Sequence, residues 1–232
     1  MTRLEVIAVE GLPEIRSGDR LAPLLAACAD LLDGDVVVVT QKVVSKAEGR
    51  VVAVDPDDPA AYAAVIEAEC VRVLRRRGDL VIAETAAGFV CANAGVDRSN
   101  VPEGFVTLLP VDADRSARRI RDGLRASPGV EVGVIVSDTF GRTWRRGVVD
   151  VAIGCAGIAA VVDLRGTSDA LGRPLEVTEV AVADELAAAA ELVMGKATGV
   201  AAAVIRGVSR SWFRDSSVRA EIVRPPAEDL FR

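Results

Sequence analysis

An uninterrupted run of four valines at residues 36–39 constrains the fold of this chain more than any other stretch. A strand with one solvated face alternates apolar and polar residues, whereas a strand buried on both faces can be apolar throughout. The run therefore predicts a strand that other elements cover on both faces. A polar segment, residues 40–50, follows at its carboxyl end.

The remaining patterns predict an irregular alternation of helices and strands. Apolar residues at helical spacing predict helices over residues 19–32, 59–77, 116–126 and 180–194, and the arginines at 72 and 75–77 are interpreted as the solvated end of the second helix. Short apolar runs predict strands over residues 4–9, 80–82, 89–91, 134–136, 149–153, 158–164, 200–205 and 220–223. This order favours an α+β fold over a regular doubly wound sheet. Without a repeat or clear linker, we expect a single domain over residues 1–232, built as one unit or as two intertwined subdomains.

Charge and hydropathy exclude several kinds of partner. The chain has 28 Lys and Arg residues against 34 Asp and Glu, a net charge of −6, and only 3% aromatic residues. It therefore lacks the basic field and the stacking platform of a nucleic-acid-binding protein. The first ten residues alternate and carry acids, unlike a signal peptide, and no apolar run approaches the ~20 residues that span a bilayer. We expect a cytoplasmic protein that binds neither nucleic acid nor membrane.

The chain contains no histidine and four scattered cysteines. The lack of histidine removes Ser-His and Cys-His nucleophiles, H-E-x-x-H zinc sites and histidine acid–base catalysis. Cys28, Cys70, Cys91 and Cys155 form no C-x-x-C pair and are interpreted as free thiols. Any catalysis must use carboxylates, lysine, arginine, hydroxyls or a metal bound by oxygens.

Asp138 and Thr139 follow the predicted strand at residues 134–136, separated from it only by Ser137. A carboxylate beside a hydroxyl where a buried strand leaves the core is suited to Mg²⁺ or Mn²⁺ bound against phosphate. The same pair is also an ordinary cap of a turn or of a following helix. Local pattern leaves both interpretations open.

Two more segments that follow β runs have a composition suited to a metal-phosphate. Ser45 and Lys46 place a hydroxyl beside an ammonium that could contact phosphate oxygens, and Asp97 and Asn100 supply a carboxylate and an amide. Each has a plain structural alternative, because Lys46 could be a solvated strand-end lysine and the other two could be turn residues. Spacing alone does not show that the three segments meet.

Common nucleotide fingerprints are absent. Neither G-x-x-x-x-G-K-[ST] nor G-x-G-x-x-G after the first strand is present, so the sequence has no P-loop or Rossmann fingerprint. Asp184 and Glu185 are adjacent on a predicted helix and are interpreted as solvent-exposed charges, because neighbouring helical side chains point about 100° apart. Arg142, Arg145 and Arg146 around Trp144 could grip an anion or lie on a surface loop.

Five ordered segments nevertheless resemble one known family, the coenzyme F420:L-glutamate ligases, also called F420 gamma-glutamyl ligases. They are residues 11–15, 41–50, 95–101, 136–142 and 177–185, and the similarity extends from about Val6 to Phe231. The resemblance implies a fold of two intertwined mixed α/β subdomains and a homodimer. Some relatives carry a further carboxyl-terminal flavin-reductase-like domain, which would begin near residues 225–232, so we expect a stand-alone ligase or part of a two-domain protein.

The resemblance also implies an activity. GTP would activate the lactyl carboxylate of F420-0, a deazaflavin precursor, as an acyl-phosphate, and the amine of L-glutamate would then form the amide with release of GDP and phosphate. Mg²⁺ or Mn²⁺ would be required, and a further requirement for a monovalent cation is left open. Phosphoryl transfer needs positioning and charge neutralisation more than it needs histidine, so this chemistry fits the composition.

Site residues follow from the resemblance position by position. It assigns nucleotide binding to Leu12, Pro13, Glu14, Ile15, Gln41, Lys46 and Asn100. It assigns binding of a first divalent metal to Asp97 and Asp138, and binding of a second divalent metal to Thr139. The loop after Arg206 and Gly207, which also has a share in nucleotide or metal binding in the family, diverges here.

Our hypothesis from the sequence is a metal-dependent GTP ligase that adds L-glutamate to F420-0. One alternative is a non-catalytic protein that binds a deazaflavin or a nucleotide. Another is a related carboxylate–amine ligase with a different substrate. The sequence does not identify the general base, the number of glutamates added or the preferred metal.

Overall fold

A mixed five-stranded sheet forms the centre of the computed structural model, which describes residues 3–230, so Phe231 lies outside the described residues. The strands lie in the order β1 (Glu5–Ala8), β12 (Ala202–Arg206), β2 (Val36–Thr40), β8 (Gly133–Gly141) and β9 (Val148–Ala156). Strands β2 and β8 run parallel, and the other neighbouring pairs run antiparallel. The sheet is therefore mixed, in agreement with the predicted α+β class.

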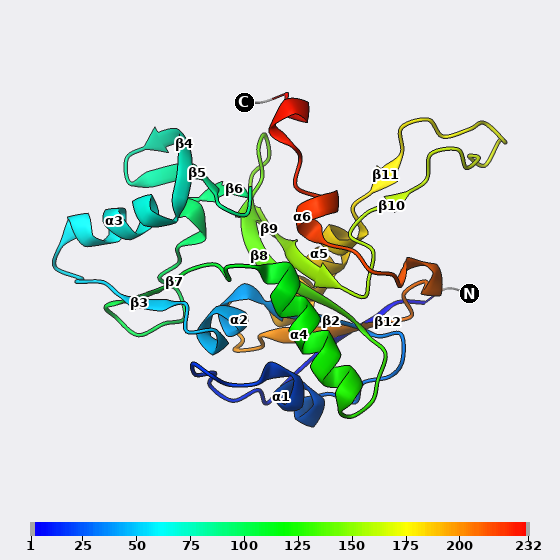
Figure 1. Ribbon diagram of the computed structural model, residues 1–232, viewed down its shortest axis with the longest axis horizontal. Coiled ribbons are helices and arrows are strands. Elements are labelled where there is room, and N and C mark those ends of the chain that lie inside the picture. The colour runs from blue at the N-terminus through cyan, green and yellow to red at the C-terminus, as the bar shows by residue number, and fades with distance from the viewer. Residues whose placement is uncertain (1–2, 231–232) are drawn as a thin grey trace.

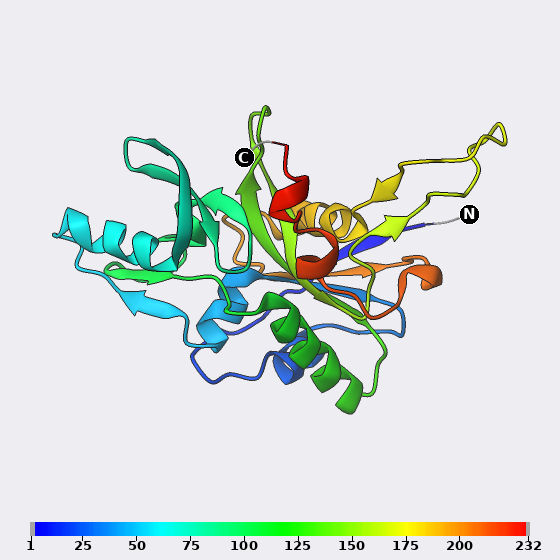
Figure 2. The same cartoon turned by 45° about the horizontal axis from the view of Figure 1, so that its top comes forward.

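Helices cover both faces of this sheet (Figures 1 and 2). On one face, Val37 and Val39 share an apolar cluster with α1 (Leu21–Cys28) and α4 (Ala113–Ala126). On the other face, Val36 and Val38 share a cluster with α5 (Val182–Met194). All four valines are fully buried, which confirms the predicted strand with two covered faces.

A smaller lobe lies between α2 (Gln41–Ala47) and α4 in the sequence. It contains a three-stranded antiparallel sheet of β4 (Cys70–Arg77), β5 (Leu80–Thr85) and β6 (Val90–Ala92), and a two-stranded ladder of β3 (Val51–Ala53) and β7 (Phe105–Thr107). Helix α3 (Pro59–Glu69) and the 3₁₀ turn η1 (Asn93–Gly95) complete it. The lobe has its own apolar cluster, so the chain leaves the larger core after α2 and returns to it at α4.

An arm projects from the larger lobe (Figures 1 and 2). The short strands β10 (Val162–Asp163) and β11 (Glu179–Val180) form its base, and backbone hydrogen bonds such as Gly166 N to Leu175 O continue the pairing outward. Leu171 and Val177 on the arm are 79% and 86% exposed. The chain then ends with η2 (Arg210–Trp212), α6 (Val218–Glu221) and η3 (Pro226–Glu228).

The long helix predicted over residues 59–77 is wrong in its second half. Helix α3 ends at Glu69, and the following residues form β4 at the edge of the small sheet. β-branched Val71 and Val73 favour extended backbone, and the arginines at 72 and 75–77 line this edge and do not form a helix end. Arg72 pairs with Glu84 at 3.2 Å. Charged side chains on an edge strand oppose pairing with a second chain.

Two predictions near the carboxyl end were also wrong. Residues 220–223, predicted as a strand, form the second half of α6 and the turn after it, and the start of α6 is capped by the Ser217 side chain accepting from Ala220 N. The apolar run at residues 158–164 forms a strand only at Val162 and Asp163, because Ile158, Ala159 and Ala160 are buried beneath other elements instead of pairing in a sheet. Apolar runs this short do not distinguish strand from buried coil.

The four cysteines are free thiols, as predicted. Cys91 and Cys155 are buried, and this burial raises the pKa of each thiol to about 12. Cys28 and Cys70 are half-buried. Among residues 3–230, no helix is both long enough and apolar enough to cross a membrane.

Candidate functional site

The ends of all five strands of the central sheet meet at one edge. Because β2 and β8 are parallel, Thr40 pairs with Ser137 at their carboxyl ends. Strand β12 is antiparallel to β2 and so begins at this edge, while β1, antiparallel to β12, ends there. A crevice at the carboxyl ends of parallel strands is the usual ligand site of such sheets.

A cavity of about 680 Å³ occupies this edge. Its walls come from the segment after β1, from α2, from the ends of β8 and β9, from the loop between α5 and β12, and from the small-lobe loop after η1. Nine of the predicted site residues line it: Leu12, Pro13, Glu14, Ile15, Gln41, Lys46, Asn100, Asp138 and Thr139. The three predicted segments therefore meet, although they lie up to about a hundred residues apart in sequence.

Helix α2 carries the polar residues of the first wall. Ser45 and Lys46 are helical and Lys46 is not a strand-end lysine, because β2 passes into α2 at Gln41 without an intervening turn. Lys42 and Lys46 lie four residues apart and so share one helix face. The ammonium of Lys46 pairs with Glu14 at 2.6 Å, whereas Ser45 Oγ donates to Leu108 O at the start of the connection to α4.

Gln41, the first residue of α2, is almost completely buried, with 1% of its surface exposed. Its side-chain oxygen Oε1 has no hydrogen-bond partner among the described residues. A buried acceptor without a partner costs about 1–3 kcal/mol, so a ligand that donates to it would recover this energy.

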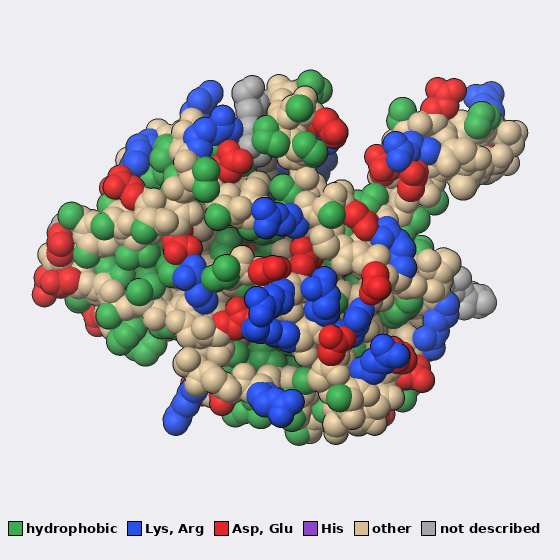
Figure 3. Space-filling model, in the orientation of Figure 1, with side chains coloured by type: hydrophobic (Ala, Val, Ile, Leu, Met, Phe, Trp, Pro, Cys, Tyr) green, Lys and Arg blue, Asp and Glu red, His purple; other side chains and the backbone are tan. Residues whose placement is uncertain are grey.

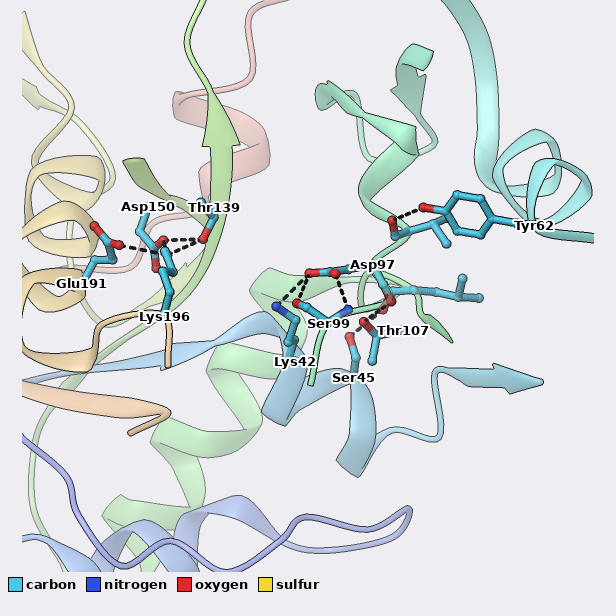
Figure 4. Close-up of polar contacts among 12 residues, drawn as sticks. Lys42, Ser45, Tyr62, Asp97, Ser99, Thr107, Thr139, Asp150, Glu191 and Lys196 are labelled. Carbon is cyan, nitrogen blue, oxygen red and sulfur yellow. Dashed lines mark hydrogen bonds and ion pairs between the residues drawn. The ribbon is translucent and has the colours of Figure 1, made fainter. Parts of the chain in front are cut away.

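Asp97 lies on the small-lobe loop and joins this loop to α2 (Figure 4). Lys42 Nζ pairs with Asp97 Oδ2 at 2.7 Å, and Ser99 donates to the same carboxylate through both its backbone N and its Oγ. Although burial acts to raise it, these bonds hold the pKa of Asp97 below its usual value. Asn100, close by, has a positive φ of 57°, which asparagine tolerates better than most residues.

Asp138 and Thr139 are strand residues, since β8 continues to Gly141. The interpretation of Asp138 as a cap is therefore wrong. Side chains alternate along a strand, so Asp138 and Thr139 point to opposite faces of β8. Burial raises the pKa of Asp138 to about 7, and the negative charges of Asp97 and Asp150 act in the same direction. Asp138 forms no ion pair with any residue between 3 and 230.

A second polar network surrounds Thr139, and sequence reasoning missed it. Asp150 on β9 is 2% exposed and accepts hydrogen bonds from Ser137 Oγ at 3.0 Å and Thr139 Oγ1 at 2.7 Å. Lys196, in the loop before β12, donates to Thr139 Oγ1 at 2.6 Å and to Asp150 Oδ1 at 2.7 Å, and it pairs with Glu191 at 3.0 Å (Figure 4). Although burial lowers it, these bonds raise the pKa of Lys196 above its usual value.

Lysine usage is the sequence signal that could have located this network. Lys42, Lys46 and Lys196 are the only lysines among the 28 basic residues of the chain. All three line the cavity. Arginine supplies every other positive side chain, so the compact ammonium group is confined to this site.

Several other candidates lie away from the cavity. Arg142, Arg145 and Arg146 are exposed on the β8–β9 hairpin with Trp144. Asp184, predicted to be exposed, is half-buried and accepts from Ala152 N at 2.9 Å, and burial raises its pKa, while Glu185 is exposed. The loop after Arg206 packs elsewhere, with Arg210 donating to Asp33 O. Residues 194–197 and 199–201, which precede β12, line the cavity in its place.

The carboxylates present could hold one divalent cation only with help from a ligand. No group of three or more Asp, Glu or Cys side chains among residues 3–230 is arranged to hold a metal by itself. Mg²⁺, however, is commonly bound by one or two carboxylates together with phosphate and water oxygens. Asp138, which forms no ion pair among residues 3–230, and Asp97, whose carboxylate stays charged beside Lys42, fit that description. Thr139 does not, because its neutral hydroxyl already donates to Asp150 and accepts from the ammonium of Lys196.

Carboxylates, ammonium groups and a buried acceptor without a partner surround one open cavity, a set of groups whose chemistry suits a multiply charged, phosphate-bearing ligand. Residues 11–207 match the family described as F420-0:Gamma-glutamyl ligase, and the chain belongs to this family.

Curated relatives cover essentially the whole chain. It is 44% identical to the coenzyme F420:L-glutamate ligase of Methanopyrus kandleri over 100% of both chains. Identity to the protein of the same name from Methanothermobacter thermautotrophicus is 43%, over 99% of each chain. Identity to the protein of the same name from Archaeoglobus fulgidus is 42%, over 99% of this chain and 97% of the relative.

Proposed function

We propose that this protein is a GTP-dependent ligase that joins L-glutamate to the lactyl carboxylate of F420-0. The relatives named as coenzyme F420:L-glutamate ligases support the two substrates. The observation that carries the proposal is the gathering of all three lysines and Asp138 around one cavity, with Asp97 paired to Lys42 beside it. Such a set of charges suits a nucleoside triphosphate and a second anionic substrate.

Two steps are required, because a carboxylate is a poor acyl donor. A carboxylate oxygen of F420-0 attacks the γ-phosphorus of GTP, which forms an acyl-phosphate and releases GDP. The amine nitrogen of glutamate then attacks the acyl carbon, the C–O bond to phosphate breaks, and phosphate leaves. The amine also loses a proton, which a carboxylate or the departing phosphate takes up. Catalysis of this kind comes from positioning and from stabilising negative charge.

The cavity residues have separable roles in nucleotide binding. Lys46, now paired with Glu14, would turn to phosphate oxygens, and Glu14 is exposed enough to remain solvated without it. Gln41 Oε1 would accept a hydrogen bond from the nucleotide. Leu12, Pro13 and Ile15 would pack against it, and Asn100 would close the site from the small lobe.

Asp97 and Asp138 would hold Mg²⁺ or Mn²⁺. The cation, when bound, would neutralise charge on the phosphate groups. Asp97 belongs to the small lobe and Asp138 to the large one, so the distance between the two carboxylates depends on the relative position of the lobes. Lys42 keeps the Asp97 carboxylate ionised and oriented.

We further propose that the protein is a homodimer and that the arm contributes to its interface. The arm extends from the body as a separate hairpin (Figure 3), and Leu171 and Val177 would remain solvated in a monomer. Exposed apolar side chains on a projecting hairpin are typical of a surface that a partner covers.

The test of the activity is a coupled assay. Purified protein is mixed with GTP, Mg²⁺, L-glutamate and F420-0, GDP is quantified by chromatography, and the product is identified by mass. We expect one GDP for each glutamate added, and no GDP above background without F420-0. Binding without GDP release would support the non-catalytic alternative. Turnover only with the dehydro analogue of F420-0 or another carboxylate would support the related ligase.

Asp138→Asn is the informative variant, because it keeps the side-chain shape and removes the charge. We expect it to lose most of the GDP release, by at least ~100-fold, as expected for a lost electrostatic contact in phosphoryl transfer. Asp79→Asn, in the exposed β4–β5 turn, is the matched control and should retain full activity. Unchanged turnover in Asp138→Asn would contradict the assignment.

A further inference from the structure

The position of Lys196 differs from that of the other two lysines. Lys42 and Lys46 each pair with one carboxylate, whereas Lys196 Nζ contacts three oxygens from three elements, at 2.6, 2.7 and 3.0 Å. These are the hydroxyl of Thr139, the buried carboxylate of Asp150 and the carboxylate of Glu191. An ammonium with three oxygen neighbours fills a small cation site built by the protein itself.

Thr139 is the residue to which the family resemblance assigns a second divalent metal. In this chain the hydroxyl of Thr139 donates its one proton to Asp150 and accepts from Lys196. A divalent cation on the same oxygen would need Thr139 Oγ1 at about 2.0–2.2 Å and would have to displace the ammonium. Two cations within a few ångströms of one another would also repel strongly in this partly buried place.

The first cation site is separate from this network. Asp138 and Thr139 point to opposite faces of β8, so Asp138 faces the small lobe and Lys42, while Thr139 faces Asp150 and Lys196. Among residues 3–230, Asp138 forms no ion pair and feels the Lys42 ammonium only beyond ion-pair distance, whereas both carboxylates beside Thr139 are paired with the Lys196 ammonium. The Thr139 face of β8 therefore already has a cation in contact with it, and Asp138 on the other face has none in contact.

We infer that the ammonium group of Lys196 takes the place of the second divalent cation, so that this protein works with one divalent cation per active site. The inference rests on the proposed metal-dependent nucleotide site and specifies its composition. A tethered cation is present at every metal concentration and needs no separate binding step. Lys196 would thus supply, from the loop before β12, positive charge next to the phosphate site.

The test is the number of Mn²⁺ ions that the protein binds. Free Mn²⁺ is measured by electron paramagnetic resonance during titration of the full chain in the presence of a non-hydrolysable GTP analogue. We expect one Mn²⁺ per wild-type chain. Lys196→Met removes the ammonium but keeps the apolar stem, and it should bind two, because Asp150, Glu191 and Thr139 are then free to act as ligands with phosphate and water.

Two control variants isolate the charge. Lys196→Arg retains a cation and should bind one Mn²⁺, like the wild type. The double variant Lys196→Met/Asp150→Asn lacks both the ammonium and the buried carboxylate and should also bind one. It also avoids leaving the 2%-exposed Asp150 carboxylate unpaired, and so guards against loss of folding in the single variant. Circular dichroism melts without metal verify that each variant is folded.

The outcomes separate the inference from the proposed function. Two Mn²⁺ ions per wild-type chain would overturn the inference alone, and so would one Mn²⁺ in both the wild type and a folded Lys196→Met. If the wild type bound no Mn²⁺ with the analogue present, the proposed metal-dependent site would fail and the inference with it.

Discussion

Replacement of Asp138 by asparagine should stabilise the metal-free protein even as it removes activity. In the folded protein, burial raises the pKa of Asp138 from 3.8 to about 7. The unfolded chain has the ordinary value, so folding of the charged form is penalised above pH 7. As pH falls from 7 towards 4, the folded carboxyl takes up a proton before the unfolded one does, and the penalty disappears. Asparagine carries no charge and never incurs it.

The size of the effect follows from the same values. The difference between 3.8 and about 7 corresponds to roughly 4 kcal/mol, at about 1.4 kcal/mol per pH unit. Part of the Asp138 side chain faces the cavity, where water screens the charge, so we expect ~2–4 kcal/mol. The amide can still accept the backbone N–H of Thr139. For a chain of this length, ~2–4 kcal/mol raises the melting temperature by about 5–15 °C.

The assay is thermal unfolding in EDTA at a series of pH values between 4.5 and 8.5, for wild type, Asp138→Asn and the control Asp79→Asn. The advantage of Asp138→Asn over wild type should be largest above pH 7 and should shrink steadily as pH falls. Added Mn²⁺ with nucleotide should raise the melting temperature of wild type and not that of Asp138→Asn. Equal stability of the two proteins at pH 8 would refute the reasoning, as would an advantage that does not change with pH.

Three further predictions concern other parts of the molecule. Gly154→Ala should destabilise the protein by about 3 kcal/mol or more in urea unfolding, because the added Cβ would lie 2.2–2.5 Å from the backbone of Ala113 and Asp114 on α4. Gly141→Ala is the control and should change stability little, because the space around Gly141 is open. Lys46→Met should raise the KM for GTP by ~10–100-fold with little change in melting temperature, since a charged phosphate contact is lost while exposed Glu14 stays solvated; an unchanged KM would place the phosphates elsewhere. Leu171→Asp combined with Val177→Asp should convert a dimer to a monomer in light scattering after gel filtration without lowering the melting temperature, and a dimer that persists would exclude the arm from the interface.

Local sequence patterns predicted the large lobe better than the small one. The valine run of β2 has two covered faces, and α4 and α5 lie where helical spacing placed them, because burial on a face leaves a periodic pattern. In the small lobe, α3 and β4 follow one another without a turn signal, so a single helix pattern extended across both. Edge strands with charged side chains look like solvated helix ends at the level of sequence.

The site was predicted in its residues but not in its geometry. Segments around Gln41, Asp97 and Asp138 could be identified as polar residues that follow β runs, yet only the strand order brings them to one edge. The parallel pairing of β2 with β8 and the opposite faces of Asp138 and Thr139 are tertiary facts. Asp150 and Lys196 escaped notice because neither lies in a pattern that differs from ordinary strand and loop residues.

The confinement of lysine to the cavity also fixes where the protein can react with electrophiles that acylate primary amines. Guanidinium groups do not compete under mild conditions, since arginine stays protonated, and the remaining basic side chains are all arginines. Apart from the α-amino group, an amine-directed reagent has three targets, and all of them line one cavity. The mass added to the intact protein would therefore report directly on whether the cavity is occupied, and enzymatic or chemical lysine acetylation would fall on the site itself.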